Sequence, residues 1–258
     1  MNKYTTYWTA FKTILIKEVL RFARIWIQTV MPPVITTTLY FIIFGKLIGD
    51  RIGEMDGYRY IDFIVPGLIL MAVISHSYAN VVSSFYSSKF QHHIEEILIA
   101  PVAEWIILAG YVAGGVARGM VVGLVVTLVS LFFIDLNIQH YGLTVLVVIL
   151  TSILFALAGF INAVFANSFD DVSIIPTFVL VPLTYLGGVF YSIQLLPEFW
   201  RNLSLANPVL YMINAFRYSI LGVSDIEPGF ALSLVLGFIL ILGGVALWLL
   251  KKGVGIKT

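Results

Sequence analysis

Six long apolar runs divide the chain, and short polar segments separate them. Each run has about the 20 residues that a helix needs to cross a hydrocarbon layer of about 30 Å. Every backbone group in such a layer must be paired internally, and the runs lack the alternation of barrel strands, so each is predicted to be a helix. The predicted spans are residues 26–47, 62–84, 105–133, 142–166, 174–193 and 230–250. The pattern predicts an all-α polytopic membrane protein with one transmembrane domain, residues 1–258.

Composition supports this fold class and excludes several others. Hydrophobic residues make up 60% of the 258 positions and charged residues only 11%, which is too little polar surface to cover a soluble core of this size. The absence of cysteine excludes a disulfide framework and a thiolate metal site. The net charge of +1 gives no bulk attraction to nucleic acid, so no nucleic-acid partner is predicted.

The basic residues predict the orientation of the chain in the membrane. Six spans place both ends on one side, and that side carries nine lysines and arginines against five on the other. Basic residues accumulate in cytoplasmic segments, so both termini are predicted to be cytoplasmic. The richer side carries Lys3, Lys12, Lys17, Arg21, Arg24, Lys89, Lys251, Lys252 and Lys257, and the poorer side carries Lys46, Arg51, Arg59, Arg201 and Arg217.

The segment before the first span, residues 7–26, has apolar and basic positions on different helical faces. This pattern predicts an N-terminal amphipathic helix in the cytoplasmic interface of the membrane. The alternative is a cytoplasmic extension of the first span. The apolar face consists of Trp8, Phe11, Leu15, Val19 and Phe22, and the basic face consists of Lys17, Arg21 and Arg24.

Two features of the second and third spans are candidates for a substrate path. His76, Asn80 and Ser84 recur at helical spacing and form a polar stripe, which either bonds to another helix or lines a water-filled path. Arg118 lies near the middle of the third span, where a charge costs at least about 2.5 kcal/mol on insertion scales. No acidic residue is expected at the same depth, so Arg118 should face protein or a cavity, with a structural and a transport role equally open.

Glycines repeat along the third span at four-residue spacing. Small residues at this spacing allow helix backbones to approach closely, so the third span is predicted to pack tightly against its neighbours. The two series are Gly110 with Gly114, and Gly115 with Gly119 and Gly123.

A short amphipathic segment, residues 89–105, connects the second and third spans on the predicted cytoplasmic side. Ile94 and Leu98 form an apolar side, Gln91, Glu95 and Glu96 form a polar one, and Pro101 closes the helix. A helix this short is unstable alone, so it should dock against something. His92 and Glu96 lie one turn apart, but two ligands on a solvated helix are weak grounds for a metal site, and none is predicted.

The segment between the fifth and sixth spans is apolar but broken. Pro197 and Pro208 divide it into pieces of about ten residues that also carry Arg201, Asn207 and Arg217. Such pieces fit re-entrant helices that dip into the outer leaflet, and together they would form a lid over a path. On the opposite side, Asp170 and Asp171 are predicted to cap the N-terminus of the fifth span.

These outer residues resemble the signature of the ABC-2 family of transporter permeases. The resemblance rests on Leu183, Leu186, Gly187 and Gly188, followed by Leu196-Pro197, Asn207-Pro208, Tyr211 and Arg217. The cytoplasmic run EEILIAPV, residues 95–102, is similar to the coupling segment of that family, and the similarity extends over essentially the whole chain.

The resemblance implies a function and a set of site residues. Members pair two six-helix subunits with two ATP-binding subunits, and this chain has no G-x-x-x-x-G-K-[ST] phosphate loop. The expected function is the permease subunit of an ATP-driven exporter in a bacterial inner membrane. The chain would form a homodimer among membrane lipids, with a heterodimer with a second permease as the alternative, and a separate ABC ATPase would bind ATP and Mg. It would not itself be an enzyme and would hold no cofactor. The implied roles are ATPase coupling for Gln91, Glu95, Glu96, Leu98 and Pro101; substrate path for His76, Asn80, Ser84 and Arg118; and outer signature for Gly187, Gly188, Pro197, Asn207, Pro208, Tyr211 and Arg217.

Three other classes of membrane protein fit less well. Ion-coupled carriers usually have a titratable acid near the midplane and repeated halves, and neither is evident here. An intramembrane hydrolase would need a motif such as G-x-S-x-G or H-E-x-x-H, and the chain has neither. A purely structural subunit explains the spans but neither the coupling-like segment nor the outer signature. The composition fits lipid-linked, glycolipid or other amphipathic cargo, and it fits drug efflux equally.

Overall fold

The structure is a computed structural model that describes residues 3–99 and 101–255, apart from the side chains of Lys46, Asp50 and Leu98. Helices form nearly all of it, and one short hairpin supplies the strands. The elements are α1 (Lys3–Arg24), α2 (Trp26–Tyr40), the π-helix η1 (Phe41–Ile48), α3 (Gly49–Ile52), β1 (Glu54–Met55), β2 (Tyr58–Arg59), α4 (Tyr60–Phe90), α5 (His93–Ile99), α6 (Glu104–Ser130), α7 (Tyr141–Phe165), α8 (Phe169–Ile175), the π-helix η2 (Pro176–Leu180), α9 (Val181–Leu186), the 3-10 helix η3 (Ile193–Leu195), α10 (Glu198–Leu205), α11 (Pro208–Leu221) and α12 (Pro228–Lys252).

Within the described residues, six helical stretches are long and apolar enough to cross a membrane, which confirms the six predicted spans. Their bounds are Trp26–Gly45, Tyr60–Phe90, Glu104–Ser130, Tyr141–Phe165, Phe169–Leu186 and Pro228–Lys252. Two differ from the prediction by more than three residues, the second at one end and the fifth at both ends. The second continues to Phe90 rather than ending near 84, and the fifth runs from Phe169 to Leu186 rather than over 174–193.

Local chemistry explains the shifted fifth span. The Ser168 hydroxyl accepts a hydrogen bond from the Asp171 backbone N–H at 3.1 Å, and the Asp171 carboxylate accepts one from the Ser168 backbone N–H at 3.1 Å. This capping box starts the helix five residues early, so the N-cap is Ser168 and the predicted carboxylate, Asp171, stands at the third helical position. At the other end, Gly188 has a φ of +77°, and this left-handed conformation stops the helix.

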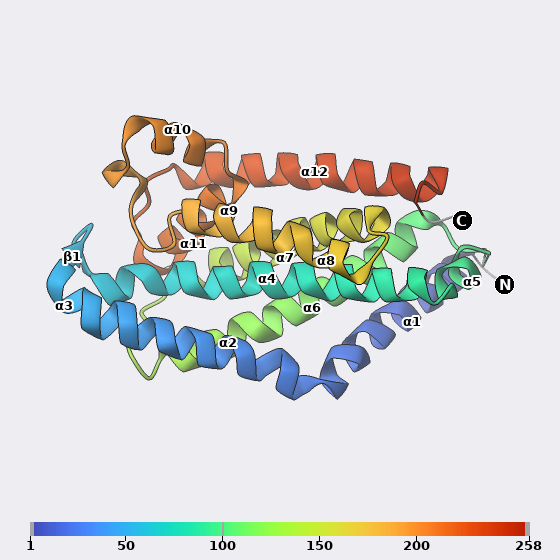
Figure 1. Cartoon of the computed structure of the whole chain (residues 1–258), viewed down its shortest axis with the longest axis horizontal. Helices are drawn as coiled ribbons and strands as arrows, with labels where there is room; N and C mark the ends of the chain where they lie inside the picture. The colour runs from blue at the N-terminus through green and yellow to red at the C-terminus, as the bar shows by residue number, and fades with distance from the viewer. Residues whose placement is uncertain (1–2, 100, 256–258) are drawn as a thin grey trace.

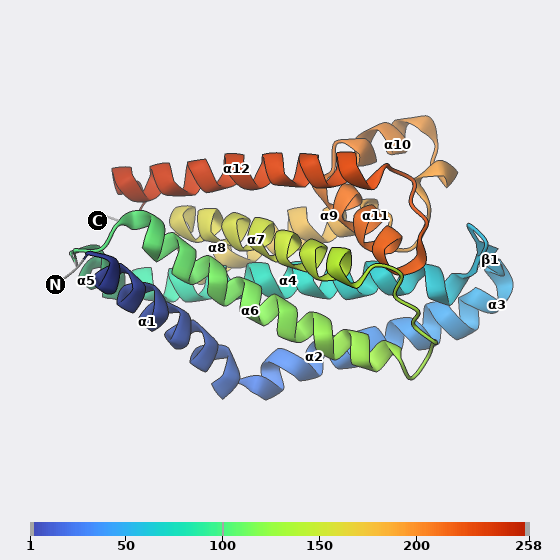
Figure 2. The same cartoon turned by 180° about the vertical axis from the view of Figure 1, so that it is seen from behind.

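The long helices lie side by side in an elongated bundle with α4 at its centre (Figures 1 and 2). The start of α1, the end of α12 and the whole of α5 gather at one end of the bundle. The β1–β2 hairpin, α3 and α10 gather at the other end. An even number of spans therefore brings both ends of the described chain to one side. That this side is cytoplasmic stays a prediction, and we call it the α5 end and the opposite side the α10 end.

Close helix contacts at the glycines of α6 confirm the predicted tight packing. A Cβ on Gly114 would lie 2.5 Å from the Glu18 Cβ of α1, and one on Gly110 would lie 2.6 Å from the Ile14 side chain. The second series faces α4 and α7, since a Cβ on Gly115 would lie 2.8 Å from Val81 and 2.9 Å from Ala156. The first glycine series thus packs against α1, and the second packs against α4 and α7 on another side of α6.

Helix α1 packs on α6 through a stripe that the amphipathic pattern did not indicate. The buried residues of α1 are Ile14, Glu18 and Phe22, which recur every four residues and face one way. Trp8, from the predicted apolar face, is 65% exposed. A bend at Ile25 separates α1 from α2, and the two helices form an open V beside α6 (Figure 2).

Candidate functional site

The predicted coupling segment forms α5 at one end of the bundle, next to the last turn of α4. Gln91 ends α4, and His92 takes a φ of +59° that turns the chain into α5. Ile94 is buried and fixes α5 to the core, whereas Glu95, Glu96 and Pro101 are exposed. The predicted anchor Leu98 lies in α5, but its side chain is outside the part of the chain that the structure describes.

One exposed apolar residue on α5 was missed by sequence reasoning. Ile99 is 84% exposed at the end of this helix, beside the two exposed glutamates. A cavity of about 300 Å³ adjoins this surface and is lined by residues of α1, α5 and the start of α6, among them Thr13, Glu96 and Ile97. The α5 end therefore presents a mixed apolar and acidic surface whose backbone rests on the bundle.

Lys89 connects this surface to the helices behind it. Its ammonium group donates hydrogen bonds to the backbone carbonyls of Val164 and Ala166, both at 2.8 Å. A cation at these carbonyls also complements the negative end of the α7 dipole. The last turn of α4, just before α5, is thereby tied to the junction of α7 and α8.

Two of the predicted path residues, Asn80 and Ser84, are part of a buried ion-pair network with α1. We call Lys17, Glu18, Arg21, Asn80 and Ser84 the Glu18 network. The Glu18 carboxylate accepts a hydrogen bond from Ser84 Oγ at 2.5 Å and lies 3.4 Å from the Arg21 guanidinium. Arg21 also donates to the Asn80 side-chain and backbone oxygens at 2.8 and 2.7 Å.

Glu18 is a buried acidic residue that was not singled out from the sequence, and it lies on α1, outside the six spans. Its side chain is 0% exposed and packs against Gly114 of α6. The sequence signal was the recurrence of Ile14, Glu18 and Phe22 at four-residue spacing, which placed Glu18 in the middle of an otherwise apolar stripe. Its carboxylate is paired with Arg21, however, and forms no ion pair with Arg118.

The other two predicted path residues, His76 and Arg118, are not part of this network. Arg118 is 8% exposed and forms no ion pair with a described residue. Gly119 follows Arg118 in the chain but faces another side of α6, where a Cβ on it would meet the hydroxyl groups of Ser77 and Ser152. We call His76, Ser77, Arg118 and Ser152 the Arg118 cluster. Each has a buried polar atom without a hydrogen-bond partner among the described residues: Nδ1, Oγ, Nε and Oγ respectively.

The outer signature residues meet at the α10 end. Asn207 caps α11: its Oδ1 accepts from the Val209 N–H at 3.0 Å, and its Nδ2 donates to the Leu183 carbonyl at 2.6 Å. Pro208 is the first residue of α11, where its missing N–H costs nothing. A Cβ on Gly187 would lie 2.7 Å from the Val209 side chain, so this glycine allows α9 and α11 to meet.

Arg217, near the other end of α11, also contacts the segment after α9. It is 1% exposed, donates to the Gly188 carbonyl at 2.6 Å and stacks over the Phe63 ring at 3.8 Å. Tyr211 donates to the Leu205 carbonyl at 2.6 Å and so joins α11 to α10. Pro197 is the N-cap of α10. The structure thus brings the predicted signature together as the joint between α9, α10 and α11.

The two short helices of the outer segment differ in burial. Twelve of the 14 residues of α11 are buried, so it is an interior helix. At 1.5 Å per residue it is about 21 Å long, too short to span a membrane. In contrast, α10 exposes Phe199, Trp200 and Leu203 at the end of the bundle. This pair has the form expected of re-entrant helices, and its depth in the membrane stays a prediction.

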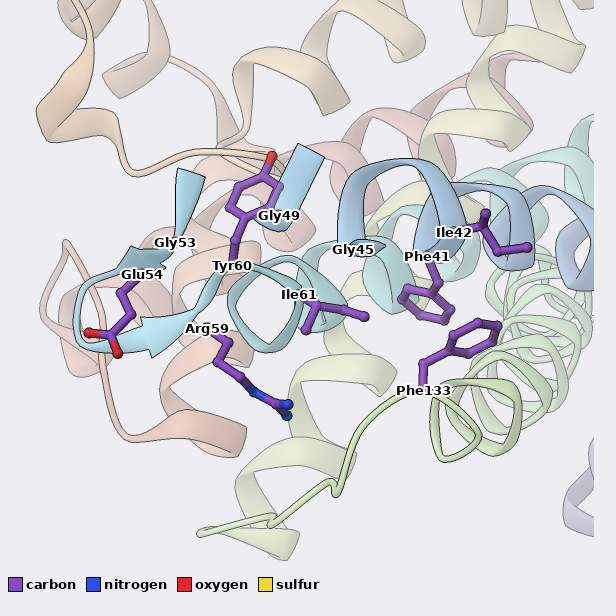
Figure 3. A pocket seen from close by; sticks show the side chains of 10 residues that line it. All are labelled: Phe41, Ile42, Gly45, Gly49, Gly53, Glu54, Arg59, Tyr60, Ile61 and Phe133. Atoms are coloured by element: carbon purple, nitrogen blue, oxygen red, sulfur yellow. The ribbon is translucent and has the colours of Figure 1, made fainter. Parts of the chain in front are cut away.

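A cavity of about 440 Å³ opens near the β1–β2 hairpin (Figure 3). Phe41 of η1 and Phe133 after α6 face each other at one end, with ring centroids 5.1 Å apart. Glu54 and Arg59 of the hairpin lie at the other end. Asp62 accepts two hydrogen bonds from Arg59, at 2.8 and 3.1 Å, and raises the pKa of that guanidinium. The cavity therefore is apolar at one end and charged at the other.

Another cavity, of about 750 Å³, lies between α1 and the start of α6. Aromatic side chains line it, including Tyr7 and Trp105, whose rings meet edge to face at 6.2 Å. Lys3 stands among them. Tyrosine, tryptophan and lysine gather at membrane interfaces, which agrees with the predicted interfacial position of α1. Among the described residues, no group of three or more His, Cys, Asp or Glu side chains is arranged to hold a metal ion.

Comparison with known proteins identifies the family. The model of the family described as "ABC-2 type transporter" matches residues 9–221. The chain is 54% identical over 252 residues to "Inner membrane transport permease YadH" of Escherichia coli (strain K12), with 98% of each chain covered. It is 23% identical over 190 residues to "Nodulation protein J" of Rhizobium leguminosarum bv. viciae, with 71% of each chain covered. The family model spans most of the chain, including α5 and α11, so the chain belongs to the ABC-2 type transporter family.

Proposed function

We propose that the chain is the inner-membrane permease subunit of an ATP-driven exporter, with a separate, YadG-like ABC ATPase as its partner. The observation that carries this proposal is the family match over residues 9–221. The permease name of the relative that is 54% identical supports the same reading. ATP and Mg would be bound by the partner, because this chain has no phosphate-binding loop.

The surface of α5 has the features of a coupling site. It combines the 84% exposed Ile99 with the exposed Glu95 and Glu96, while Ile94 anchors the helix to the bundle. An anchored helix can transmit a push from a partner to α4, which continues into the membrane-spanning part. The Lys89 hydrogen bonds would pass the same movement to α7 and α8. In this proposal the α5 end, with both termini, faces the cytoplasm.

A second copy of the chain would complete the path. The spans Trp26–Gly45, Phe169–Leu186 and Pro228–Lys252 are the least buried of the six, so their outer faces are free for lipid or another subunit. A homodimer would use one of these faces. In each subunit the Arg118 cluster would lie along the path, and α10 and α11 would form the lid at its outer end.

The test is an Ile99→Asp variant in the complex with its ATPase. The position is exposed, so the chain should insert as the wild type does. Interface energy concentrates in a few apolar contacts, and an unpaired charge at such a contact is costly, so a loss of about 2 kcal/mol or more is expected. This corresponds to at least about 30-fold weaker association. Co-purification of the ATPase and cargo-stimulated ATP hydrolysis, at equal membrane abundance, are the measurements.

The matched control is Leu195→Asp, the same change of charge at a residue that is 68% exposed and lies in η3, between α9 and α10. It should leave ATPase association unchanged, because in the proposal it faces the other side of the membrane. Equal ATPase binding by the wild type and the Ile99→Asp variant would remove α5 as the coupling site.

A further inference from the structure

The face through which α1 packs on α6 continues beyond the contact between the two helices. Ile14 lies on this face and is buried against α6, where a Cβ on Gly110 would lie 2.6 Å from its side chain. Phe11, Tyr7 and Tyr4 precede Ile14 at spacings of three or four residues and therefore lie on the same face of α1. Tyr4 is nevertheless 82% exposed. The two helices thus separate toward their first turns, and the described chain leaves the face of α1 uncovered there.

The space between the separating helices is the cavity of about 750 Å³, which we call the aromatic groove. Tyr4, Tyr7, Trp8 and Phe11 line this groove from α1, and Trp105 lines it from the first turn of α6. The Tyr7 and Trp105 rings meet edge to face across it, with centroids 6.2 Å apart. The volume is within the 300–1,000 Å³ that is typical of sites for small molecules.

The groove lies at the depth where a membrane changes from head groups to hydrocarbon. Helix α6 has 27 residues, so at 1.5 Å per residue it is about 40 Å long. A bilayer has a hydrocarbon core of about 30 Å and measures about 40–45 Å with its head groups, so the first turn of α6 lies among the head groups. Trp105 belongs to this turn, and Ala109, which also lines the groove, lies one turn closer to the hydrocarbon. The molecule that surrounds a membrane protein at this depth is lipid.

The charge around the groove complements an anion. Lys3 is the one charged residue among the described residues that line it. The first 17 residues of the chain contain three lysines and no acidic residue. Lys12 is exposed one helical turn after Trp8, so this part of α1 carries two positive charges, against the single negative charge of Glu104 at the start of α6. Basic residues at a membrane surface attract anionic lipids.

We propose that the aromatic groove binds one anionic phospholipid from the leaflet at the α5 end. The lipid phosphate lies at Lys3, and the upper part of one acyl chain lies between the rings of α1 and α6. The tyrosine and tryptophan rings pack against the acyl chain and keep their polar atoms at the level of the head groups. The lipid joins α1 to α6 where their own side chains do not fill the space. This inference goes beyond the proposed transport function, because the lipid is a bound component of the fold and not the cargo.

The test is quenching of tryptophan fluorescence by brominated lipids in the full-length chain, reconstituted without its ATPase. Trp8 and Trp105 line the groove and serve as reporters after the other three tryptophans, Trp26, Trp200 and Trp248, have been changed to phenylalanine. Vesicles of dioleoyl phosphatidylcholine carry a small share of lipid brominated on its acyl chains, either phosphatidylglycerol or phosphatidylcholine. The brominated phosphatidylglycerol should bind about fivefold more tightly, which is the preference that one lysine at a membrane surface confers.

Two variants and one control separate the groove from general electrostatics. Lys3→Gln should abolish the fivefold preference, because it removes the charge that holds the phosphate. Ala109→Phe places a ring in the groove at unchanged charge and should reduce the quenching by both lipids. Lys252→Gln provides the control, because it removes the same charge from an exposed residue in the last turn of α12, at the same end of the bundle. It should leave the preference unchanged.

Four results would overturn the proposal. The first is equal binding of the two brominated lipids by the reporter chain, and the second is a preference that survives Lys3→Gln. The third is an equal loss of preference in Lys3→Gln and Lys252→Gln, which would attribute it to the net charge of this end of the protein. The fourth is undiminished lipid quenching in Ala109→Phe together with loss of ATPase association, which would assign the groove to the partner protein.

Discussion

The Glu18 network and the Arg118 cluster both hold a charged side chain among the helices, but only the network pairs it with an opposite charge. In the network, the Glu18 carboxylate is bonded to Ser84 and Arg21, and Arg21 is bonded to Asn80. In the cluster, Arg118 has no acidic partner among the described residues, and its polar neighbours have no partners either. The polar stripe predicted from the sequence, His76, Asn80 and Ser84, is divided between the two groups.

This difference predicts opposite effects of the two groups on stability. A buried charge that is fully bonded holds its helices together, and removing one partner leaves the other uncompensated. A buried charge without partners raises the energy of the folded protein and is retained where a ligand uses it. The network therefore fixes α1 to α4 and α6, whereas Arg118 has no acidic partner among the described residues.

The largest expected effect is an opposite response of stability to the loss of each charge. Glu18→Met should destabilise the protein by about 3–5 kcal/mol, because Arg21 loses its buried partner. Arg118→Met should be neutral or stabilising, since it removes a charge that nothing in the protein compensates. Reversible unfolding of both variants in mixed detergent measures the difference.

Glu18→Gln is the control for packing in this comparison, because it keeps the shape of the side chain and one acceptor oxygen. It should lose less stability than Glu18→Met. If Arg118→Met proved as damaging as Glu18→Met, Arg118 would be a structural residue, and the contrast between the two groups would not hold.

The next effect is a partial recovery in a double variant. Glu18→Met with Arg21→Met removes both members of the pair and leaves apolar side chains of similar length between α1 and α4. Replacing a whole buried pair is often neutral, so the double variant should be about 2 kcal/mol more stable than Glu18→Met alone. Unfolding of the four proteins of this cycle gives the coupling energy, and strictly additive losses would show that Glu18 and Arg21 act independently.

The spans could be predicted from the sequence because their signal is local. Twenty consecutive apolar residues suffice to define a helix in a membrane, and all six were found. The two misplaced ends of the fifth span lie where one local feature decides the helix boundary. Ser168 and Asp171 start the fifth span by a reciprocal pair of hydrogen bonds, and Gly188 ends it by a left-handed turn. The apolar content of the sequence indicates neither feature.

The site could be predicted only as a set of residue types. The outer residues Asn207 and Arg217 were singled out, but their partners, the backbone carbonyls of Leu183 and Gly188, follow from the packing of α9 against α11. Asn80 and Arg118 looked alike as polar residues in a span. They differ in their contact with Glu18 of α1, which lies more than 60 positions before Asn80 in the chain and contacts it. No local sequence pattern shows which of the two polar residues Glu18 contacts.

The smallest effect is expected from two serines that differ in one hydrogen bond. Ser84 and Ser152 are both buried in the interior of a helix, so a change to alanine adds the same helix propensity, about 0.5 kcal/mol, at each position. Ser84→Ala also removes the 2.5 Å hydrogen bond to the Glu18 carboxylate, and bonds to charged groups contribute about 1.5–3 kcal/mol.

Ser152→Ala removes a hydroxyl that has no partner among the described residues and should therefore stabilise the protein slightly. The net difference between the two variants should be about 1.5 kcal/mol or more, with Ser84→Ala the less stable. Unfolding under the same detergent conditions resolves a difference of this size. A Ser152→Ala variant that is as unstable as Ser84→Ala would mean that the Ser152 hydroxyl is bonded within the protein.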